Sequence, residues 1–252
     1  MLAILLMSAS LQAGPVKNII SLDLCTDWML LKYASRAQVR AYSPLLYRYP
    51  ADWVPKNLPV HDGSLEQILE LEPDLLITGE YNAILLRQRL AQLGRAVQIL
   101  PLPDSLKSIH DYQQQFLSAI KSGTTSTEMG LGRHYPKKNQ TLLLLGANGI
   151  GTGQDTLEHD LLVRAGWNNY IQQSGYVNLQ LEQIVADPPD AVYHPAPLSN
   201  SLANLFANHP VLKKLMAETP EAEPPDTENW RWQCPGPWSL ELIETLSAWQ
   251  KA

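Results

Sequence analysis

The sequence predicts an α/β protein with two similar lobes, each built around a mostly parallel sheet. The main observation is a repeat: residues 65–74 read LEQILELEPD and residues 181–190 read LEQIVADPPD, with the first four and the last two positions identical. In both copies a proline ends a short helix, because proline cannot continue the helical hydrogen bonding. An apolar run follows that is short enough for a buried strand. Strand-like and helix-like segments alternate along the chain, which is typical of parallel sheets with helices on their faces.

The length and the composition leave room for two cores. The chain has 252 residues, of which 45% are apolar, and domains of half this length fold readily. A stretch rich in glycine, serine and threonine interrupts the pattern at residues 123–140. We therefore expect an N-terminal lobe over residues 16–122, a linker over residues 123–140 and a C-terminal lobe over residues 141–252.

The predicted first lobe alternates strands and helices. Ser64 is placed to cap the first repeat helix, and Gly94 follows the last apolar position of a later helix. Residues 43–59 form a long loop that contains aromatic and proline residues, and long loops of this kind usually carry function. Strands are expected at residues 16–22, 39–42, 75–78 and 97–100. A loop is expected at residues 23–27, and helices are expected at residues 27–34, 83–93 and 105–122, with the first repeat helix starting at residue 65.

The second lobe is expected to restart the same pattern. A glycine-rich turn at residues 148–155 follows its first strand, and a partly helical stretch at residues 199–215 is broken at Pro210. Trp230, Arg231 and Trp232 alternate in polarity as a strand does. Strands are expected at residues 141–145 and 191–193, and helices at residues 156–165, from 181 and at 239–249.

The first thirteen residues are predicted to be a secretory signal. An apolar run over residues 2–7 precedes small residues and a candidate cleavage point near Ala13, although the usual basic residues before the run are missing. The segment is too short to span a bilayer, and no later stretch reaches the roughly 20 apolar residues that a spanning helix needs. We expect an exported, soluble protein.

Charge and cysteine content exclude some partners and suggest one covalent bond. The formal net charge is −6 and no basic run exceeds the pair Lys137 and Lys138, which argues against nucleic acid as a partner. Cys25 and Cys234 are the two cysteines. In an oxidising compartment an even number of cysteines favours a disulfide.

Two other classes of function stay open. Residues 146–153 are rich in glycine and follow a predicted strand, as in a Rossmann-type NAD(P)-dependent oxidoreductase, but their spacing departs from GxGxxG and no acidic residue follows at the distance that would hold a ribose. His61 and His194 each follow a short extended segment, which would suit a protein that binds free metal ions. No paired-histidine, serine-hydrolase or phosphate-loop motif occurs. We predict no enzymatic activity, no metal ligands and no cofactor.

The aromatic residues favour a bulky ligand. The chain has seven Trp and ten Tyr but two Phe, a balance that favours rings with a polar group. Several of them lie on predicted loops and strand ends, and such rings in two facing lobes would suit a partly apolar small molecule.

Five segments, in a fixed order along the chain, carry a resemblance to a known family. They are residues 19–22 (IISL), 64–75 (SLEQILELEPDL), 161–168 (LLVRAGWN), 181–190 (LEQIVADPPD) and 234–237 (CPGP). Together they resemble the periplasmic substrate-binding proteins of ATP-driven importers for siderophore-bound iron, cobalamin and haem. The resemblance covers nearly all of the chain after residue 13, and its specificity lies in the order of the segments and in the duplication.

This resemblance implies two Rossmann-like lobes joined by a helical linker, with the ligand in a cleft between them. It further implies a periplasmic monomer that captures a metal chelate, either a ferric siderophore or a corrinoid such as cobalamin. The protein would deliver that chelate to the permease dimer of an ABC importer in the inner membrane. The ligand-binding residues implied by position are Asp23, Leu24, Cys25, Thr26, Tyr47, His61, Asp62, Glu80, Tyr81, Asn148, Tyr176, His194, Trp230 and Trp232.

The resemblance also implies roles for two glutamates and for the cysteines. Glu66 and Glu182 stand where members of the family present one acidic residue per lobe to arginines of the permease, and charge-assisted pairs of this kind orient an interface. Cys25 and Cys234 map beside the cleft on opposite lobes. Our hypothesis is a disulfide that ties the lobes together, with a thiol ligand site and two unrelated thiols as the alternatives.

The sequence departs from the pattern of the family in three places. Tyr176 stands where cobalamin-binding relatives carry an aromatic residue, but Val60 or His61 and Gly79 replace two aromatic residues of the first lobe. No basic cluster for an anionic siderophore replaces them. Residues 123–140 are short and glycine-rich compared with the long rigid helix of the family.

Overall fold

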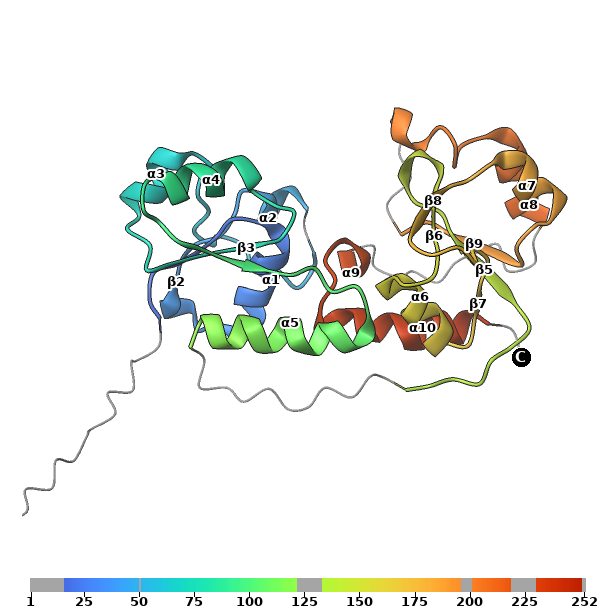
Figure 1. Ribbon diagram of the computed structural model, residues 1–252, viewed down its shortest axis with the longest axis horizontal. Coiled ribbons are helices and arrows are strands. Elements are labelled where there is room, and N and C mark those ends of the chain that lie inside the picture. Colours follow the sequence, from blue (N-terminus) through green and yellow to red (C-terminus); the bar gives the residue numbers. More distant parts are fainter. Residues whose placement is uncertain (1–15, 50, 122–132, 196–200, 219–229, 251–252) are drawn as a thin grey trace, which may run out of the picture.

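The computed structural model describes residues 16–49, 51–121, 133–195, 201–218 and 230–250. The predicted signal at residues 1–13 and much of the predicted linker lie outside these residues. Two α/β bodies lie side by side in Figure 1, one formed by the N-terminal part of the chain and the other mainly by the C-terminal part. In the described ranges no helix is both long and apolar enough to cross a bilayer.

The first lobe contains a four-stranded parallel sheet with the order β2-β1-β3-β4. Its central strands are almost continuously apolar and buried, as expected for a parallel sheet covered on both faces. The strands are β1 (Ile19–Ser21), β2 (Val39–Ala41), β3 (Leu75–Gly79) and β4 (Val97–Leu100). The helices are α1 (Leu24–Tyr33), α2 (Leu45–Arg48), α3 (Leu65–Glu70) and α4 (Ile84–Gln92).

The second lobe contains a three-stranded parallel sheet with the order β7-β5-β9 and a separate antiparallel pair, β6 and β8. The strands are β5 (Thr141–Leu144), β6 (Ile150–Thr152), β7 (Asn168–Asn169), β8 (Tyr176–Asn178) and β9 (Ala191–Tyr193). The helices are α6 (Leu157–Arg164), α7 (Leu181–Ala186) and α8 (Pro210–Glu218), with short 3-10 turns η2 (Ala147–Gly149) and η3 (Leu202–Asn204).

The repeated sequence forms equivalent structures in the two lobes. Helix α3 leads into β3, which pairs with β1, and α7 leads into β9, which pairs with β5. In both lobes the aspartate before the strand binds the start of the neighbouring strand. Asp74 Oδ2 accepts a hydrogen bond from Asn18 Nδ2 at 3.3 Å, and Asp190 Oδ2 accepts one from the backbone N–H of Thr141 at 2.6 Å. The prediction of an α/β fold with two similar lobes is therefore confirmed.

Two segments of the chain contribute to the cores of both lobes. We call the hydrophobic core of the first lobe that contains Phe116 the first core, and the core around β5 and β9 of the second lobe the second core. Helix α5 (Leu106–Ala119) starts at the second core, where Ile109 packs with residues of β5 and β9. It ends at the first core. The C-terminal segment runs in the opposite sense. After α9 (Trp230–Gln233), Trp238 is buried in the first core, whereas α10 (Glu241–Trp249) packs on the second. Figure 1 shows α5 and α10 in one row below both lobes.

Several predicted elements are corrected by the structure. Residues 230–232 form a helix instead of a strand, because Trp230 packs edge-on against Trp28 and tertiary contacts override a three-residue alternation. The predicted loop at residues 23–27 forms the N-cap and the first turn of α1. The glycine-rich turn contains strand β6, and the loop over residues 43–59 contains α2. The described part of the stretch predicted to be partly helical does contain two separate pieces, η3 and α8, and α8 begins at Pro210, a position where proline is favoured.

Candidate ligand-binding site

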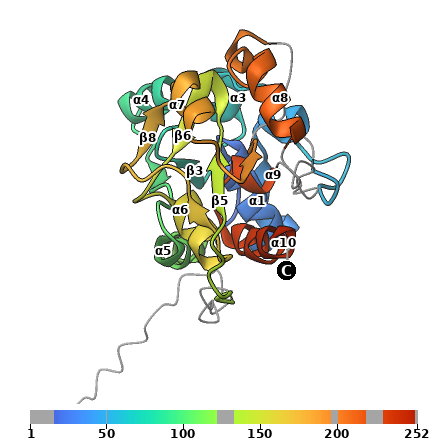
Figure 2. The ribbon, with the colours of Figure 1, turned by 90° about the vertical axis from the view of Figure 1, so that its right-hand side faces the viewer.

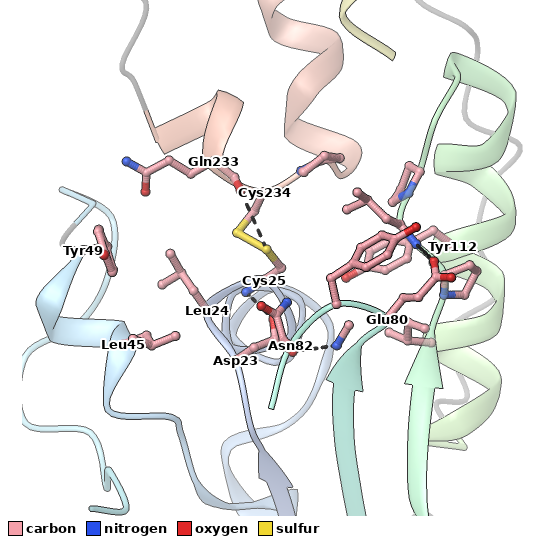
Figure 3. A pocket seen from close by; sticks show the side chains of 17 residues that line it. Asp23, Leu24, Cys25, Leu45, Tyr49, Glu80, Asn82, Tyr112, Gln233 and Cys234 are labelled. Carbon is pink, nitrogen blue, oxygen red and sulfur yellow. Dashed lines mark hydrogen bonds between the residues drawn. A yellow bond between two sulfur atoms is a disulfide. The ribbon is translucent and has the colours of Figure 1, made fainter. Parts of the chain in front are cut away.

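A cavity of about 420 Å³ lies at the carboxyl ends of three strands of the first lobe. Loops after β1, β3 and β4 line it, together with residues in and just after α2, on α5, and at and just after the end of α9 (Figure 3). In open α/β sheets, ligands bind at this end of the strands. The lining residues are Asp23, Leu24, Cys25, Leu45, Tyr49, Gly79, Glu80, Tyr81, Asn82, Leu100, Pro101, Leu102, Pro103, Tyr112, Gln233, Cys234 and Pro235.

Asp23 lies in the wall of this cavity with its side chain almost fully buried. Its Oδ1 accepts hydrogen bonds from the backbone N–H groups of Cys25 at 2.8 Å and Thr26 at 3.1 Å, so Asp23 is the N-cap of α1. Its Oδ2 accepts from the N–H of Gly79 at 2.7 Å and from the hydroxyl of Thr26 at 2.9 Å. One carboxylate therefore joins the start of α1 to the end of β3, and all four donors are neutral.

Two titratable groups behind the wall are perturbed by their surroundings. Burial raises the pKa of Asp27 to about 7, although the N–H and the hydroxyl of Ser43 donate hydrogen bonds to it at 2.8 Å and 2.6 Å. Burial, and after it the charge of Asp23, raises the pKa of Tyr112. Burial is the main cause of both shifts, and the charge of Asp23 contributes to both.

A disulfide joins Cys25 to Cys234 in the same wall, with the Cα atoms 5.1 Å apart. Cys25 lies in the first turn of α1. Cys234 is fully buried in the first core together with Trp238, and the chain then continues into α10 on the second core. The predicted disulfide is present, and it attaches to the first lobe a segment that also belongs to the second.

The structure brings one group of the predicted ligand-binding residues together. Asp23, Leu24, Cys25, Glu80 and Tyr81 all line the cavity, and Tyr81 is 67% exposed. Glu80 is also exposed, and one of its oxygens accepts a hydrogen bond from the N–H of residue 102 at 3.3 Å.

Thr26 and two other predicted residues of the first lobe, Tyr47 and Asp62, have structural contacts instead. Thr26 is fully buried, with its Oγ1 2.7 Å from the hydroxyl of Ser21. Tyr47 donates its hydroxyl to the carbonyl of residue 55 and accepts the N–H of residue 58, which closes the loop of residues 43–59 on itself. Asp62 is exposed and accepts the N–H of Ser64, before α3.

His61 is buried and both of its ring nitrogens are engaged. Nε2 lies 2.9 Å from the carbonyl oxygen of Ser21 and donates to it, while Nδ1 accepts the N–H of Gly63 at 3.0 Å. Burial lowers the pKa of His61. A neutral ring held in this tautomer has no free lone pair for a metal ion or a ligand.

The predicted residues of the second lobe do not line this cavity. Asn148 is exposed in η2 with a φ of 58°. The hydroxyl of Tyr176 lies 3.5 Å from both carboxylate oxygens of Glu158. His194 donates from Nδ1 to the carbonyl of Leu145 at 3.2 Å, and burial lowers its pKa.

The two predicted tryptophans of α9 lie in separate surroundings. Trp230 lines a second cavity, of about 370 Å³, with Trp53 and Trp238. Trp232 packs against Tyr193, with ring centroids 5.6 Å apart. Neither residue belongs to the wall that contains the disulfide.

Some lining residues were not predicted. Tyr112 fell within a predicted helix, and its position on the buried face gave no sign that the cavity would reach it. Residues 101–103 follow strand β4, so the rule that ligands bind at the carboxyl ends of strands would have found them. Leu45 and Tyr49 lie in the predicted loop over residues 43–59, and the aromatic content of that loop was the only sign in the sequence that it could contribute to a binding site.

The two alternative interpretations gain no support from the geometry. The glycines of residues 146–153 serve close packing: a Cβ on Gly153 would lie 2.0 Å from the carbonyl oxygen of Gln173, and one on Gly151 would meet Leu179. Helix α6 starts only at Leu157, with Thr156 as its cap. In the described part of the chain no group of three or more His, Cys, Asp or Glu side chains is placed to hold a metal ion.

Glu66 and Glu182 occupy matching positions in the two lobes. Each lies in the first turn of a repeat helix, α3 or α7, and each is exposed. Figures 1 and 2 place α3 and α7 at the same end of the molecule, opposite α5 and α10.

No family model matches the sequence, and no curated protein sequence matches it either. Solved structures of similar fold do exist. The periplasmic haem-binding protein HutB of Vibrio cholerae aligns with a TM-score of 0.67 and 18% identity, over 92% of this chain and 98% of its own. A possible iron-binding periplasmic solute-binding protein of Staphylococcus epidermidis aligns with a TM-score of 0.64 and 18% identity, over 94% of this chain and 99% of its own. The periplasmic vitamin B12-binding protein BtuF of Vibrio cholerae aligns with a TM-score of 0.57 and 18% identity, over 93% of this chain and 96% of its own. The chain therefore has the two-lobed fold of these periplasmic solute-binding proteins.

Proposed function

We propose that this protein is a periplasmic binding protein that captures a metal chelate and delivers it to an ABC importer, without chemistry of its own. The proteins of similar fold are described as binding haem, vitamin B12 or iron. All of these are metal ions or compact metal complexes, which suits a protein with a ligand-sized cavity.

The observation that carries this proposal is the cavity at the strand ends of the first lobe. Its volume of about 420 Å³ falls in the usual range of small-molecule sites. Its wall combines leucine and proline side chains with tyrosine rings, which can contact a bulky and partly apolar ligand. The cavity wall is also held in place before a ligand arrives, by the hydrogen bonds of Asp23 and by the disulfide.

Delivery to a permease is supported by the two glutamates. A permease dimer has two equivalent halves, and a binding protein with two similar lobes can offer one carboxylate to each half. Glu66 and Glu182 fit this role because they are exposed, occupy equivalent helices and lie at the same end of the molecule. Arginine is the residue that would recognise them best.

Titration of intrinsic tryptophan fluorescence tests the capture step. Trp238 donates a hydrogen bond from Nε1 to the carbonyl oxygen of Cys234, which lines the cavity, so a ligand in the cavity should change the emission. The probes are haemin, cyanocobalamin, a ferric tris-hydroxamate and a ferric tris-catecholate, with iron-free hydroxamate as the control. Saturable binding of at least one chelate is expected. No saturable binding of any of them, checked by equilibrium dialysis, would contradict the proposed function.

A further inference from the structure

The cavity has two carboxylates in its lining and no basic side chain among the described residues that line it. Asp23 is buried and bonded only to neutral donors, whereas Glu80 is exposed at the rim. Figure 3 shows Glu80 and Tyr112 on one side of the cavity, and Leu45 and Tyr49 on the other. A ligand that enters therefore meets two negative groups and no positive one.

The helix start that could have attracted an anion is already occupied. The first N–H groups of a helix carry partial positive charge, and in many α/β proteins they bind an anionic ligand. Here the carboxylate of Asp23 accepts the N–H groups of Cys25 and Thr26, at the start of α1. The protein supplies its own anion at this position, so an anionic ligand would be repelled where it is usually bound.

The two arginines near the cavity are engaged outside its lining. The guanidinium of Arg48 lies 5.9 Å from the centroid of the Tyr49 ring. Arg87 donates from Nη1 to the carbonyl oxygen of Gly79 at 3.5 Å. Both arginines therefore contact lining residues from outside, and neither is itself part of the lining that a ligand would touch.

We infer that the ligand of this site is a neutral or cationic, partly apolar chelate, and that the site discriminates against anionic chelates. This inference rests on the proposed function and narrows its ligand class. Ferric tris-hydroxamates, which are neutral or carry a pendant ammonium, and corrinoids belong to the accepted class. Ferric tris-catecholates and porphyrins with free propionates belong to the rejected class, because burying an unpaired anion beside a carboxylate has a large desolvation cost.

Matched ligands that differ only in charge test this inference. One series is ferrioxamine B with its free ammonium, its N-acetyl derivative and its N-succinyl derivative, which carry charges of about +1, 0 and −1 from their side-chain chemistry. The second is aquocobalamin, cyanocobalamin and a cyanocobalamin monocarboxylate. In the series that binds, we expect the anion to bind at least tenfold more weakly than the cation. The two ligands differ by two charge units, and even at the dielectric constant of water one unit charge a few ångströms from a carboxylate changes an affinity about fivefold. The difference should shrink as salt is added.

A charge reversal at the rim sharpens the test. Glu80→Lys should weaken the cationic ligand and strengthen the anionic one, so that the tenfold preference disappears. Glu70→Lys is the matched control, since Glu70 is an exposed glutamate of α3 that does not line the cavity. It should leave the preference unchanged. Thermal unfolding of both variants checks that they are folded.

The outcomes separate the two proposals. If the anionic member of a series, haemin or a ferric tris-catecholate binds as tightly as the cationic ligands, or if Glu80→Lys changes nothing, the inference about charge is wrong while capture of a chelate stands. If no chelate of any charge binds, the proposed function itself is wrong.

Discussion

The first helix of each lobe begins after the first strand of its sheet, but the two helices are capped differently. In the first lobe the buried carboxylate of Asp23 caps α1 and also binds β3. In the second lobe the hydroxyl of Thr156 accepts the N–H of His159 at 3.2 Å and donates to the carbonyl of Gly153 at 2.7 Å. The similarity of the lobes therefore includes the strands and the repeat helices, but the helix starts differ in charge.

The second lobe does contain a partly buried carboxyl near its helix start, at a different position. Glu158 lies in the first turn of α6, burial raises its pKa, and Tyr176 is close to both of its oxygens. Its position in α6 corresponds to that of Cys25 in α1, as both are second in their helices. One scaffold thus holds a disulfide and a capping carboxylate in one lobe, and a neutral cap with a titratable carboxyl in the other.

The largest expected effect comes from the exposed glutamates, where the lobes should be equivalent. Glu66→Arg and Glu182→Arg should each reduce uptake of the bound chelate, and the double variant should abolish it. Each substitution replaces a proposed ion pair with an arginine of the permease by repulsion between two positive charges. Uptake of radiolabelled chelate by cells measures the effect. Ligand affinity of the purified variants should stay unchanged, and Glu70→Arg is the control in α3. Normal uptake with the double variant would reject the docking role of both residues.

The second prediction uses the two caps, where the lobes should differ. Asp23→Ala leaves the N–H groups of Cys25, Thr26 and Gly79 without their acceptor, so we expect the free energy of unfolding to fall by about 3 kcal/mol. Thr156→Ala removes an ordinary cap and should cost about 1 kcal/mol. Urea unfolding of both variants measures the difference. Equal losses would mean that the bond from Asp23 to β3 contributes nothing beyond capping.

The smallest effect is a pH dependence of the first lobe. Because the pKa of Asp27 is raised from 3.8 to about 7, the folded state holds a proton that the unfolded state has lost, and stability should fall as the pH rises from about 4 to about 7. Asp27→Asn should flatten this slope. Its amide oxygen can accept the N–H of Ser43, and its amide nitrogen can donate to the hydroxyl oxygen of Ser43, so both contacts can persist with the second one reversed in direction. Urea unfolding at several pH values tests it. Ser43→Ala should shift the slope to higher pH, because hydrogen bonds from Ser43 lower the pKa of Asp27.

Local signals predicted the elements that local chemistry determines. The repeat helices end two or three positions before a proline, Ser64 accepts the N–H of Gln67 as a cap should, and buried strands follow as apolar runs. Elements that depend on distant partners were missed. Helix α9 is four residues long and exists because Trp230 packs on Trp28, which is about two hundred positions earlier in the sequence.

The candidate site was predictable only where strand ends determine it. Asp23 and Glu80 lie within two positions of the end of a strand, and both line the cavity. His61 also follows an extended segment, but its ring turns inward and binds the carbonyl of Ser21. Many of the tryptophans form contacts with one another, as Trp28, Trp53, Trp230 and Trp238 do. The sequence alone does not distinguish a tryptophan side chain that packs on other aromatic rings from one that contacts a ligand.

The bond between Cys25 and Cys234 has a consequence for the chain as a whole. It closes a covalent ring that spans 209 positions and includes nearly all of both lobes. A protease that cuts one peptide bond inside this ring opens the ring but releases no fragment, because the two pieces stay attached through sulfur. Only a cut combined with reduction would separate them.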